Sequence, residues 1–317
     1  MRVIDHLKAA TKTLFSYEIV PPVRGSATNI SEIFAIIEQL LPYDPKWINV
    51  TTHASSLLYV EKSDGSIIKR VHKKRPGTMG ICGVIQNKYG IDAVAYVLCQ
   101  GFSQQETEDA LIELNYMGIE NILALKGDNL NYNRKLDEGE RSNKYAVDLV
   151  KQVAKMRQGL FLGDTEYPAL DFCMGVASYP EKHFEAPSME FDLQIAKNKV
   201  DAGAQYIMTQ MFFDNKKYFE YVAACRAIGI NVPIIPGLKP LTNKKQLTIL
   251  PNIFYVDIPS DLRNAMLAAT TDEACEQVGT EWLIAQSKEL KAAGVPVLHY
   301  YTLGKPKVVR DVVAAVF

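Results

Sequence analysis

The sequence lacks the features that would place it in several broad classes of protein. Its 317 residues contain no apolar run near the roughly 20 residues that span a bilayer. Residues 1–13, MRVIDHLKAATKT, contain no apolar signal core. Thirty-five basic residues against 36 acidic ones leave a formal net charge of −1. Bulk charge therefore does not favour a nucleic acid or an anionic membrane as a partner. The odd number of scattered cysteines fits reduced core thiols, and we expect a cytoplasmic protein.

Cysteine and glycine patterns exclude two further classes of site. The five cysteines are dispersed, with no C-x-x-C pair and no zinc-type spacing to the five histidines. We therefore expect reduced thiols, no disulfides and no metal. A Rossmann nucleotide-binding domain should show G-x-G-x-x-G after a strand, and this sequence has no such motif.

Short β-branched runs alternate with amphipathic helical stretches along the whole chain. The runs begin near Leu14, Trp47, Ala93, Asn121, Asp171, Tyr206, Pro233 and Val297, and the helix candidates include 29–41, 104–117, 145–157, 189–202, 216–228 and 275–293. Repeated strand–helix alternation predicts an α/β fold with a parallel sheet. Eight units in about 300 residues suit a single (β/α)₈ TIM barrel, over residues 1–317, with extra loops and helices.

Two polar stretches interrupt this alternation. Residues 53–75 are polar and basic, with Asp64-Gly65 as a turn, and we interpret the run KRVHKKR as a solvated loop and helix start rather than a phosphate-facing patch. Residues 128–143 are also polar and are predicted to form a flexible loop. Both follow strands, and in a barrel such loops build the active-site face.

The segment FSYEIVPP, residues 15–22, places a carboxylate at the end of an apolar strand. Pro21 and Pro22 end the strand because neither can donate a backbone hydrogen bond. Glu18 either points outward and is solvated, as most charged residues are, or lies in an apolar setting that suits an acid catalyst. The strand alone leaves both possibilities open.

Polar residues stand at the carboxyl end of every predicted strand. They are Glu18, Thr51-Thr52, Gln100, Asp128, Tyr179, Gln210, Lys239 and Tyr301. In a barrel these positions converge on one mouth, where barrel enzymes keep their catalytic groups. We therefore expect one site at that mouth.

Seven segments, in order, resemble the methylenetetrahydrofolate reductase family, in particular its short bacterial form. FSYEIVPP resembles F-E-F-x-P-P, INVTTHAS resembles V-T-x-G-A, and LALKGD resembles L-A-L-R-G-D. VASYPEKHFEA and VDAGAQYIMTQMFFD resemble A-x-Y-P-E-x-H-x-E-A and V-D-A-G-A-x-x-x-x-T-Q-x-F-F-D. IIPGLKPLTNKKQL and GVPVLHYYTLGK resemble I-P-G-I-x-P-x-T-x-x-K-Q and G-V-x-x-x-H-F-Y-T-L-N-R.

The resemblance implies a flavoenzyme that reduces 5,10-methylenetetrahydrofolate to 5-methyltetrahydrofolate, with non-covalent FAD and with NADH or NADPH as co-substrate. It makes Glu18 the general acid and places Asp128 beside the flavin and the pterin. The implied FAD-binding residues are Thr51, Ala124, Leu125, Lys126, Gly127, Asp128, Tyr179, His183, Glu185, Asp192 and Lys199. The implied substrate-binding residues are Glu18, Gln210, Leu250 and Tyr301. Small molecules are the expected partners, and a homo-oligomer is possible.

The reaction itself gives these two carboxylates reasonable roles. The folate ring must open to an iminium before it accepts hydride, and opening requires a proton on the departing nitrogen. Glu18 can supply that proton if its surroundings keep it protonated near neutrality. An ionised Asp128 would favour the cationic iminium.

The chain departs from the family pattern at several positions, and other functions stay open. Tyr96 and Leu98 stand where many relatives have histidine and threonine, and Lys126 and Lys305 replace arginines. A phosphate-binding barrel lyase with Lys239 as a Schiff-base lysine is one alternative, and a non-catalytic folate-binding subunit is another. The electron donor is also open among NADH, NADPH and a partner flavoprotein or ferredoxin.

Overall fold

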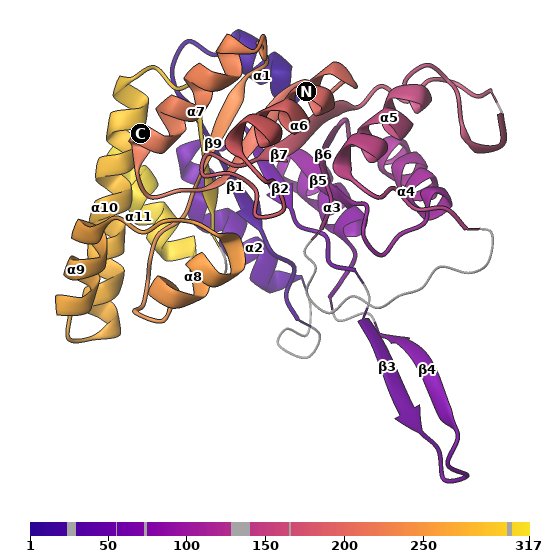
Figure 1. Cartoon of the computed structure of the whole chain (residues 1–317), viewed down its shortest axis with the longest axis horizontal. Helices are drawn as coiled ribbons and strands as arrows, with labels where there is room; N and C mark the ends of the chain where they lie inside the picture. Colours follow the sequence, from indigo (N-terminus) through magenta and orange to yellow (C-terminus); the bar gives the residue numbers. More distant parts are fainter. Residues whose placement is uncertain (24–29, 55, 73–74, 128–139, 165, 303–305) are drawn as a thin grey trace.

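The computed structural model describes residues 1–317 except 24–29, 55, 73–74, 128–139, 165 and 303–305 (Figure 1). In the described chain, parallel strands close into a barrel in the order β1-β10-β9-β8-β7-β6-β5-β2. The barrel strands are β1 (Leu14–Ile19), β2 (Trp47–Val50), β5 (Asp92–Leu98), β6 (Asn121–Leu125), β7 (Cys173–Ser178), β8 (Tyr206–Met211), β9 (Ile234–Leu238) and β10 (Val297–Tyr301). The predicted (β/α)₈ barrel is confirmed.

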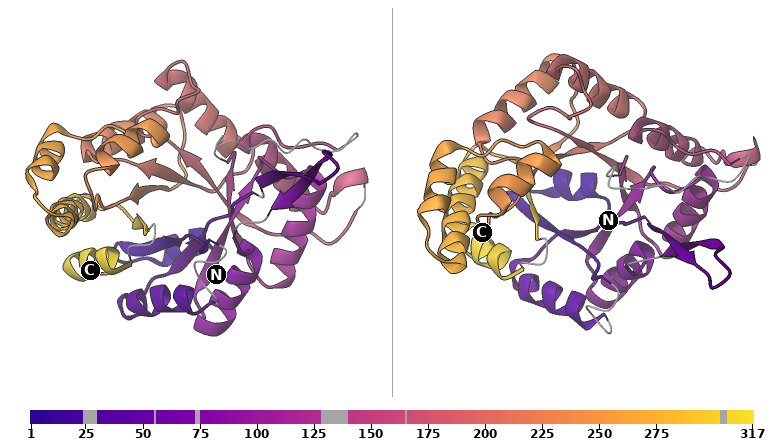
Figure 2. Two further views of the ribbon diagram at one scale, coloured as in Figure 1. Left: turned by 90° about the horizontal axis from the view of Figure 1, so that it is seen from below. Right: turned by 60° about the horizontal axis from the view of Figure 1, so that its bottom comes forward.

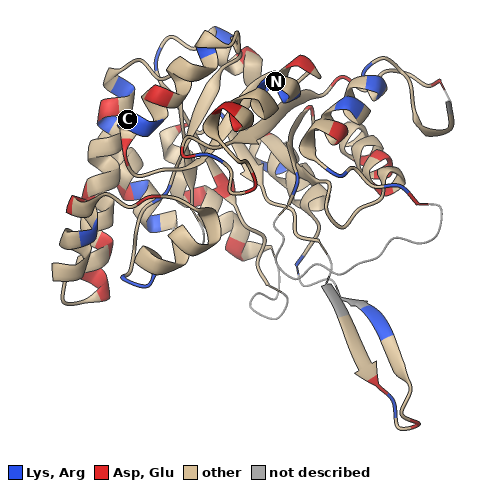
Figure 3. Ribbon diagram, viewed as in Figure 1, with Lys and Arg blue, Asp and Glu red and all other residues tan. Residues whose placement is uncertain are grey.

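Helices surround the barrel, as the right-hand view of Figure 2 shows. They are α1 (Val3–Ala9), α2 (Ser31–Leu40), α3 (Thr78–Tyr89), α4 (Gln104–Tyr116), α5 (Ala146–Met156), α6 (Met189–Asp201), α7 (Asn215–Ala227), α8 (Gln246–Phe254), α9 (Ser260–Ala268), α10 (Asp272–Ala292) and α11 (Pro306–Val316). Local chemistry fixes their ends. Before α4, the Ser103 hydroxyl accepts from the Glu106 amide at 3.1 Å, and Glu106 accepts from the Ser103 amide at 2.8 Å. In the ribbon of Figure 3, acidic and basic residues are interspersed along the helices.

Each barrel strand has one face toward the helices and one toward the barrel interior. In β1, Phe15, Tyr17 and Ile19 belong to the large core that the helices cover. Leu14 belongs to the separate interior cluster, which also contains Trp47, Tyr96, Met208 and Val297. Successive side chains of a strand point to opposite faces, so Glu18 lies on the interior face with Leu14.

Within the insertion, residues 56–72 form a β-hairpin, and the prediction of a loop and helix start there is wrong. β3 (Ser56–Glu61) pairs antiparallel with β4 (Ile67–His72), and the hairpin projects away from the barrel (Figure 1). Its turn is the predicted one, with Gly65 at φ +78° and the Asp64 carboxylate accepting from the Ser66 amide at 2.9 Å. The β-branched and aromatic residues Tyr59, Val60, Ile67 and Ile68 favour strand pairing here, although the surrounding stretch is polar and basic.

A smaller core extends the barrel between β9 and α10, where α8 and α9 are inserted. Its buried members are Met211, Phe213, Leu241, Leu250, Val256, Leu262, Met266 and Cys275. This cluster holds α8 and α9 beside the carboxyl ends of β8 and β9. All five cysteines of the chain are buried with free thiols.

Candidate functional site

The polar residues predicted at the strand ends, where the structure describes them, occupy the carboxyl edge of the barrel. By strand alternation, Glu18, Gln210, Lys239 and Tyr301 share the interior face with the apolar residues below them. The structure also brings distant members close, because Tyr301 interacts electrostatically with both Glu18 and Tyr179. Asp128, with most of the loop 128–143, lies outside the described residues.

Glu18 is buried, so the solvated strand-end interpretation is wrong. Its residue surface is only 5% exposed. The Tyr96 hydroxyl, on β5, donates to its Oε2 at 2.7 Å, and the Thr302 hydroxyl donates to its backbone carbonyl at 2.7 Å. A carboxyl group that is buried and hydrogen-bonded at a barrel mouth has the setting of an acid or base catalyst.

The strands beside Glu18 supply two more titratable side chains. The Tyr301 hydroxyl donates to the Thr209 carbonyl at 2.8 Å, and burial, reinforced by the charge of Glu18, raises its pKa well above the ordinary value. One layer below, His299 Nδ1 lies 2.8 Å from the Ser16 hydroxyl, and burial lowers the pKa of His299 to about 3. Tyr301 and His299 are therefore neutral at physiological pH.

The predicted cofactor residues after β6 and β7 form one connected group. Lys126 Nζ contacts both Glu185 carboxylate oxygens at 2.6 Å. The Tyr179 and His183 rings pack edge to face, 4.5 Å apart. The His183 amide donates to Asp192 at 2.8 Å, while its Nδ1 accepts from the Glu185 amide at 3.2 Å. In neutral His183 the proton therefore lies on Nε2, which can donate to a ligand.

Burial shifts the pKa values of two basic residues in this group, His183 and Lys199. It lowers the pKa of His183, although the carboxylate of Asp192 opposes the shift. It also lowers the pKa of Lys199, whose Nζ donates to the Ala177 carbonyl at 2.9 Å. Partly desolvated nitrogen donors beside the carboxyl end of β7 suit a ligand with anionic groups.

Two buried polar atoms at adjacent strand ends have no partner among the described residues. They are Thr51 Oγ1, after β2, and Gln100 Oε1, after β5. Gly127 lies against Gln100 at φ +95°, and a Cβ there would sit 3.3 Å from the Gln100 Cβ. Unpaired buried polar atoms are groups with which a polar ring system such as a flavin could form hydrogen bonds. Of the other predicted backbone contacts, the Leu125 carbonyl is taken by the Cys99 amide at 2.9 Å, and the Ala124 side chain is buried in the outer core.

The two remaining substrate-site predictions have different surroundings. Gln210 lines a crevice with Tyr179, Glu181 and Tyr255, and its Oε1 accepts from the Met211 amide at 2.9 Å. Leu250 is only 3% exposed, in the small core under α8. The structure thus places Gln210 at the mouth and Leu250 in packing beside it.

The sequence analysis gave three residues at this mouth no role in a reductase site. Tyr96 was noted only as a departure, yet it contacts Glu18. Lys239 is buried without a carboxylate partner in the described chain, and burial lowers its pKa to about 8. Burial also raises the pKa of Glu181 to about 7, while its Oε2 accepts from the Asp257 amide at 3.0 Å. Strand-end position pointed to Lys239, but no local signal pointed to the other two.

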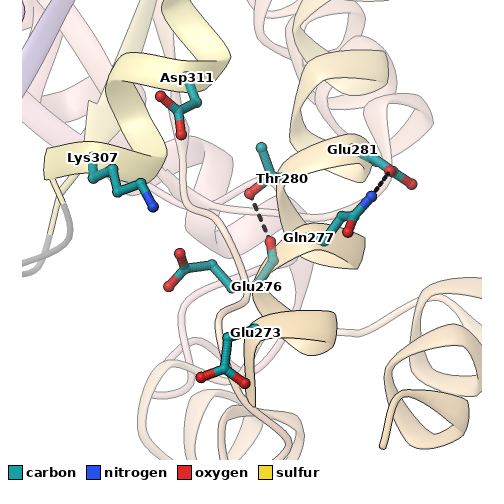
Figure 4. Close-up of a pocket in the computed structure, with 7 residues that line it drawn as sticks. All are labelled: Glu273, Glu276, Gln277, Thr280, Glu281, Lys307 and Asp311. Atoms are coloured by element: carbon teal, nitrogen blue, oxygen red, sulfur yellow. Dashed lines mark hydrogen bonds between the residues drawn. The ribbon is translucent and has the colours of Figure 1, made fainter. Parts of the chain in front are cut away.

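Other features of the described chain are weaker candidates for the functional site than this mouth. A surface hollow of about 380 Å³ lies between α10 and α11, lined by Glu273, Glu276, Gln277, Thr280, Glu281, Lys307 and Asp311 (Figure 4). It is an exposed, mainly acidic cluster on the outer helices. Among the described residues, no group of three or more potential ligands is placed to hold a metal ion. No described helix is both long and apolar enough to cross a membrane.

Comparisons with known proteins agree with the architecture and the motifs. A family model described as methylenetetrahydrofolate reductase matches residues 2–316. A 5,10-methylenetetrahydrofolate reductase of Pectobacterium carotovorum is 30% identical over 92% of this chain and 85% of its own length. Methylenetetrahydrofolate reductase (NADH) 1 of Arabidopsis thaliana is 30% identical over 97% of this chain but 49% of its own length. The chain thus spans about half the length of the first curated relatives it matches.

Solved structures share the fold at low sequence identity. A Clostridium thermocellum protein, whose structure is titled as binding two copies of 5-methyl-5,6,7,8-tetrahydrofolic acid, superposes with a TM-score of 0.60. It is 14% identical, with 99% of this chain and 98% of that chain covered. Oxaloacetate acetylhydrolase superposes with a TM-score of 0.51 at 12% identity, covering 95% of this chain and 79% of that one. At such identities the likeness concerns the barrel alone.

Proposed function

Because the chain belongs to the methylenetetrahydrofolate reductase family, we propose that it reduces 5,10-methylenetetrahydrofolate to 5-methyltetrahydrofolate. We propose FAD, bound without a covalent bond, as the cofactor and a reduced nicotinamide as the electron donor. Relatives named for NADH and for NADPH support a nicotinamide without choosing between the two. Residues 1–317 would then act as one flavin-binding catalytic domain on small-molecule substrates.

The observation that carries this proposal is the buried, hydrogen-bonded carboxyl of Glu18 at the barrel mouth. Opening the folate ring breaks a carbon–nitrogen bond whose electron pair stays on nitrogen, so that nitrogen must receive a proton. Glu18 gives up its proton there and becomes a carboxylate, as a general acid does. The Asp128 carboxylate is proposed to stabilise the cationic iminium that results.

The residues at the mouth fit a flavin dinucleotide. Thr51 Oγ1 and Gln100 Oε1 offer unpaired polar atoms to a ring system, and His183 Nε2 and the partly buried Lys199 offer donors to a pyrophosphate. Asp192 fixes the His183 backbone at 2.8 Å. When bound, FAD supplies hydride transfer between the nicotinamide and the folate. The protein residues bind, orient and protonate the reactants.

Absorbance of the purified protein tests the cofactor. We expect flavin absorbance, with FAD released on denaturation, and anaerobic addition of NADH or NADPH should bleach it. A colourless protein that takes up no added FAD would overturn the proposal and favour the Schiff-base lyase alternative.

The Glu18→Gln variant tests the acid. Glutamine keeps the size of the side chain but has no transferable proton. Bleaching of the flavin by the nicotinamide should keep nearly its native rate, while reoxidation by methylenetetrahydrofolate slows by roughly 10²–10⁴-fold. Stopped flow times the two half-reactions separately, so a loss of folding or of FAD is recognised. Native rates in both half-reactions would show that Glu18 is not the acid.

A further inference from the structure

Tyr96 projects from β5 into the barrel interior, directly below the mouth. It is 8% exposed and packs in the interior cluster with Leu123 and Met208. Its hydroxyl reaches Glu18 Oε2 at 2.7 Å and lies 3.9 Å from the Met208 sulfur. A short hydrogen bond between two buried groups on different strands fixes the relative position of both.

The rest of Glu18 is already held by the barrel. Glu18 pairs in register with Tyr301 on one side and Asn49 on the other. The Thr302 hydroxyl binds its carbonyl at 2.7 Å. These contacts fix the backbone, so the direction of the carboxyl group depends on what its oxygens contact. Tyr96 provides such a contact from inside the barrel.

Tyr96 is a neutral hydrogen-bond donor to Glu18, and the other titratable side chains of this region bond elsewhere. Burial, followed by the charge of Glu18, raises the pKa of Tyr96 well above its ordinary value, so its hydroxyl keeps its proton. From β10, Tyr301 is likewise neutral and directs its hydroxyl to the Thr209 carbonyl, while His299 has a pKa of about 3. From β9, the amine of Lys239 donates to the Pro240 carbonyl at 3.2 Å.

We propose that Tyr96 is a positioning residue for the reaction, acting through Glu18. Its hydroxyl orients the carboxyl group toward the departing nitrogen and stabilises the carboxylate left after proton transfer. The inference rests on the proposed function of Glu18 as the acid. It also gives a role to a residue that replaces the histidine of many relatives.

The test combines Tyr96→Phe with Glu18→Gln in a double-mutant cycle. Tyr96→Phe removes one oxygen and should slow reoxidation by methylenetetrahydrofolate about 10- to 100-fold, while bleaching by the nicotinamide is unchanged. In the Glu18→Gln background the same change should have little further effect, because the group through which it acts is gone. A purely structural role would slow both backgrounds equally.

The pH profile supplies a second signature. A donated hydrogen bond favours the ionised carboxylate, so without it the protonated acid persists to higher pH. The alkaline fall in the rate of folate reduction should therefore move upward by about one pH unit in Tyr96→Phe. Tyr300→Phe is the matched control, because Tyr300 is also buried but bonds Ser287 at 3.0 Å on the outer face. It should change neither the rate nor the profile.

The outcomes separate this inference from the proposed function. If the native protein does not reduce methylenetetrahydrofolate, the proposed function fails first. If the native protein turns over and Tyr96→Phe behaves like Tyr300→Phe, or slows the Glu18→Gln protein as much as the native one, the positioning role is wrong. If Tyr96→Phe folds only together with Glu18→Gln, the phenol holds the carboxyl as proposed. If neither form folds, Tyr96 is a packing residue and the inference is rejected.

Discussion

Lys239 gives the clearest prediction on stability. Its side chain is 4% exposed at the end of β9, and its only described hydrogen bond is to the Pro240 carbonyl at 3.2 Å. Burial alone lowers the pKa of the amine from 10.5 to about 8, with no described carboxylate offsetting the shift. A buried ammonium without a counter-charge destabilises the folded state.

The lowered pKa of Lys239 sets both the size of this destabilisation and its dependence on pH. About 2.5 pKa units correspond to roughly 3 kcal/mol against the folded protein at pH 7. Between pH 8 and 10.5 the unfolded chain still binds the proton that the folded protein has released. Stability of the native protein should therefore rise with pH across this window, as the penalty disappears.

Lys239→Met removes the charge and keeps an unbranched side chain of similar length. The substitution removes the charge penalty but also loses the hydrogen bond to the Pro240 carbonyl. We therefore expect the free energy of unfolding at pH 7 to rise by about 1–3 kcal/mol. The gain should shrink by about 2 kcal/mol at pH 9.5, because most of the charge penalty is gone there. Urea unfolding at both pH values measures it. Lys216→Met, at a side chain 76% exposed, is the control and should stay within about 0.5 kcal/mol.

Two results would refute this reasoning. One is a Lys239→Met protein that is less stable than the native protein at pH 7, which would mean that the ammonium has a compensating partner. The other is a gain that does not depend on pH, which would assign it to packing rather than to the charge.

Two further predictions concern the backbone beside the mouth and Glu181 in the crevice there. In Gly237→Ala, the new Cβ would lie 2.3 Å from the Thr209 carbonyl oxygen and 2.5 Å from the Tyr301 ring, so the urea midpoint should fall by the equivalent of several kcal/mol. Gly80→Ala, with nothing within 4 Å of its Cβ, should be neutral or slightly stabilising, and equal effects at both sites would contradict the close packing. Burial raises the pKa of Glu181 from 4.5 to about 7, so native stability should fall as pH rises through that window. Glu181→Gln should therefore raise the melting temperature at pH 8 more than at pH 4.5, and an equal change at both would rule out the titration of Glu181.

The barrel could be predicted from the sequence because its signals are local. Strand and helix periodicities repeat along the chain, and a capping box such as Ser103 with Glu106 involves residues three positions apart. Placing polar residues at the strand ends also predicted the mouth, because parallel strands bring these ends to one edge. The family motifs then supplied roles for Glu18 and its companions that geometry alone does not assign.

Tertiary structure decided which of those side chains are buried and what they contact. The hairpin at 56–72 depends on pairing two strands that lie within a polar and basic stretch of sequence. Leu250 became a core residue only when α8 packed beside β8. Tyr96 meets Glu18 across 78 residues of sequence. No local pattern encodes such a contact, because it exists only once the barrel closes and strand alternation turns both side chains into the same interior.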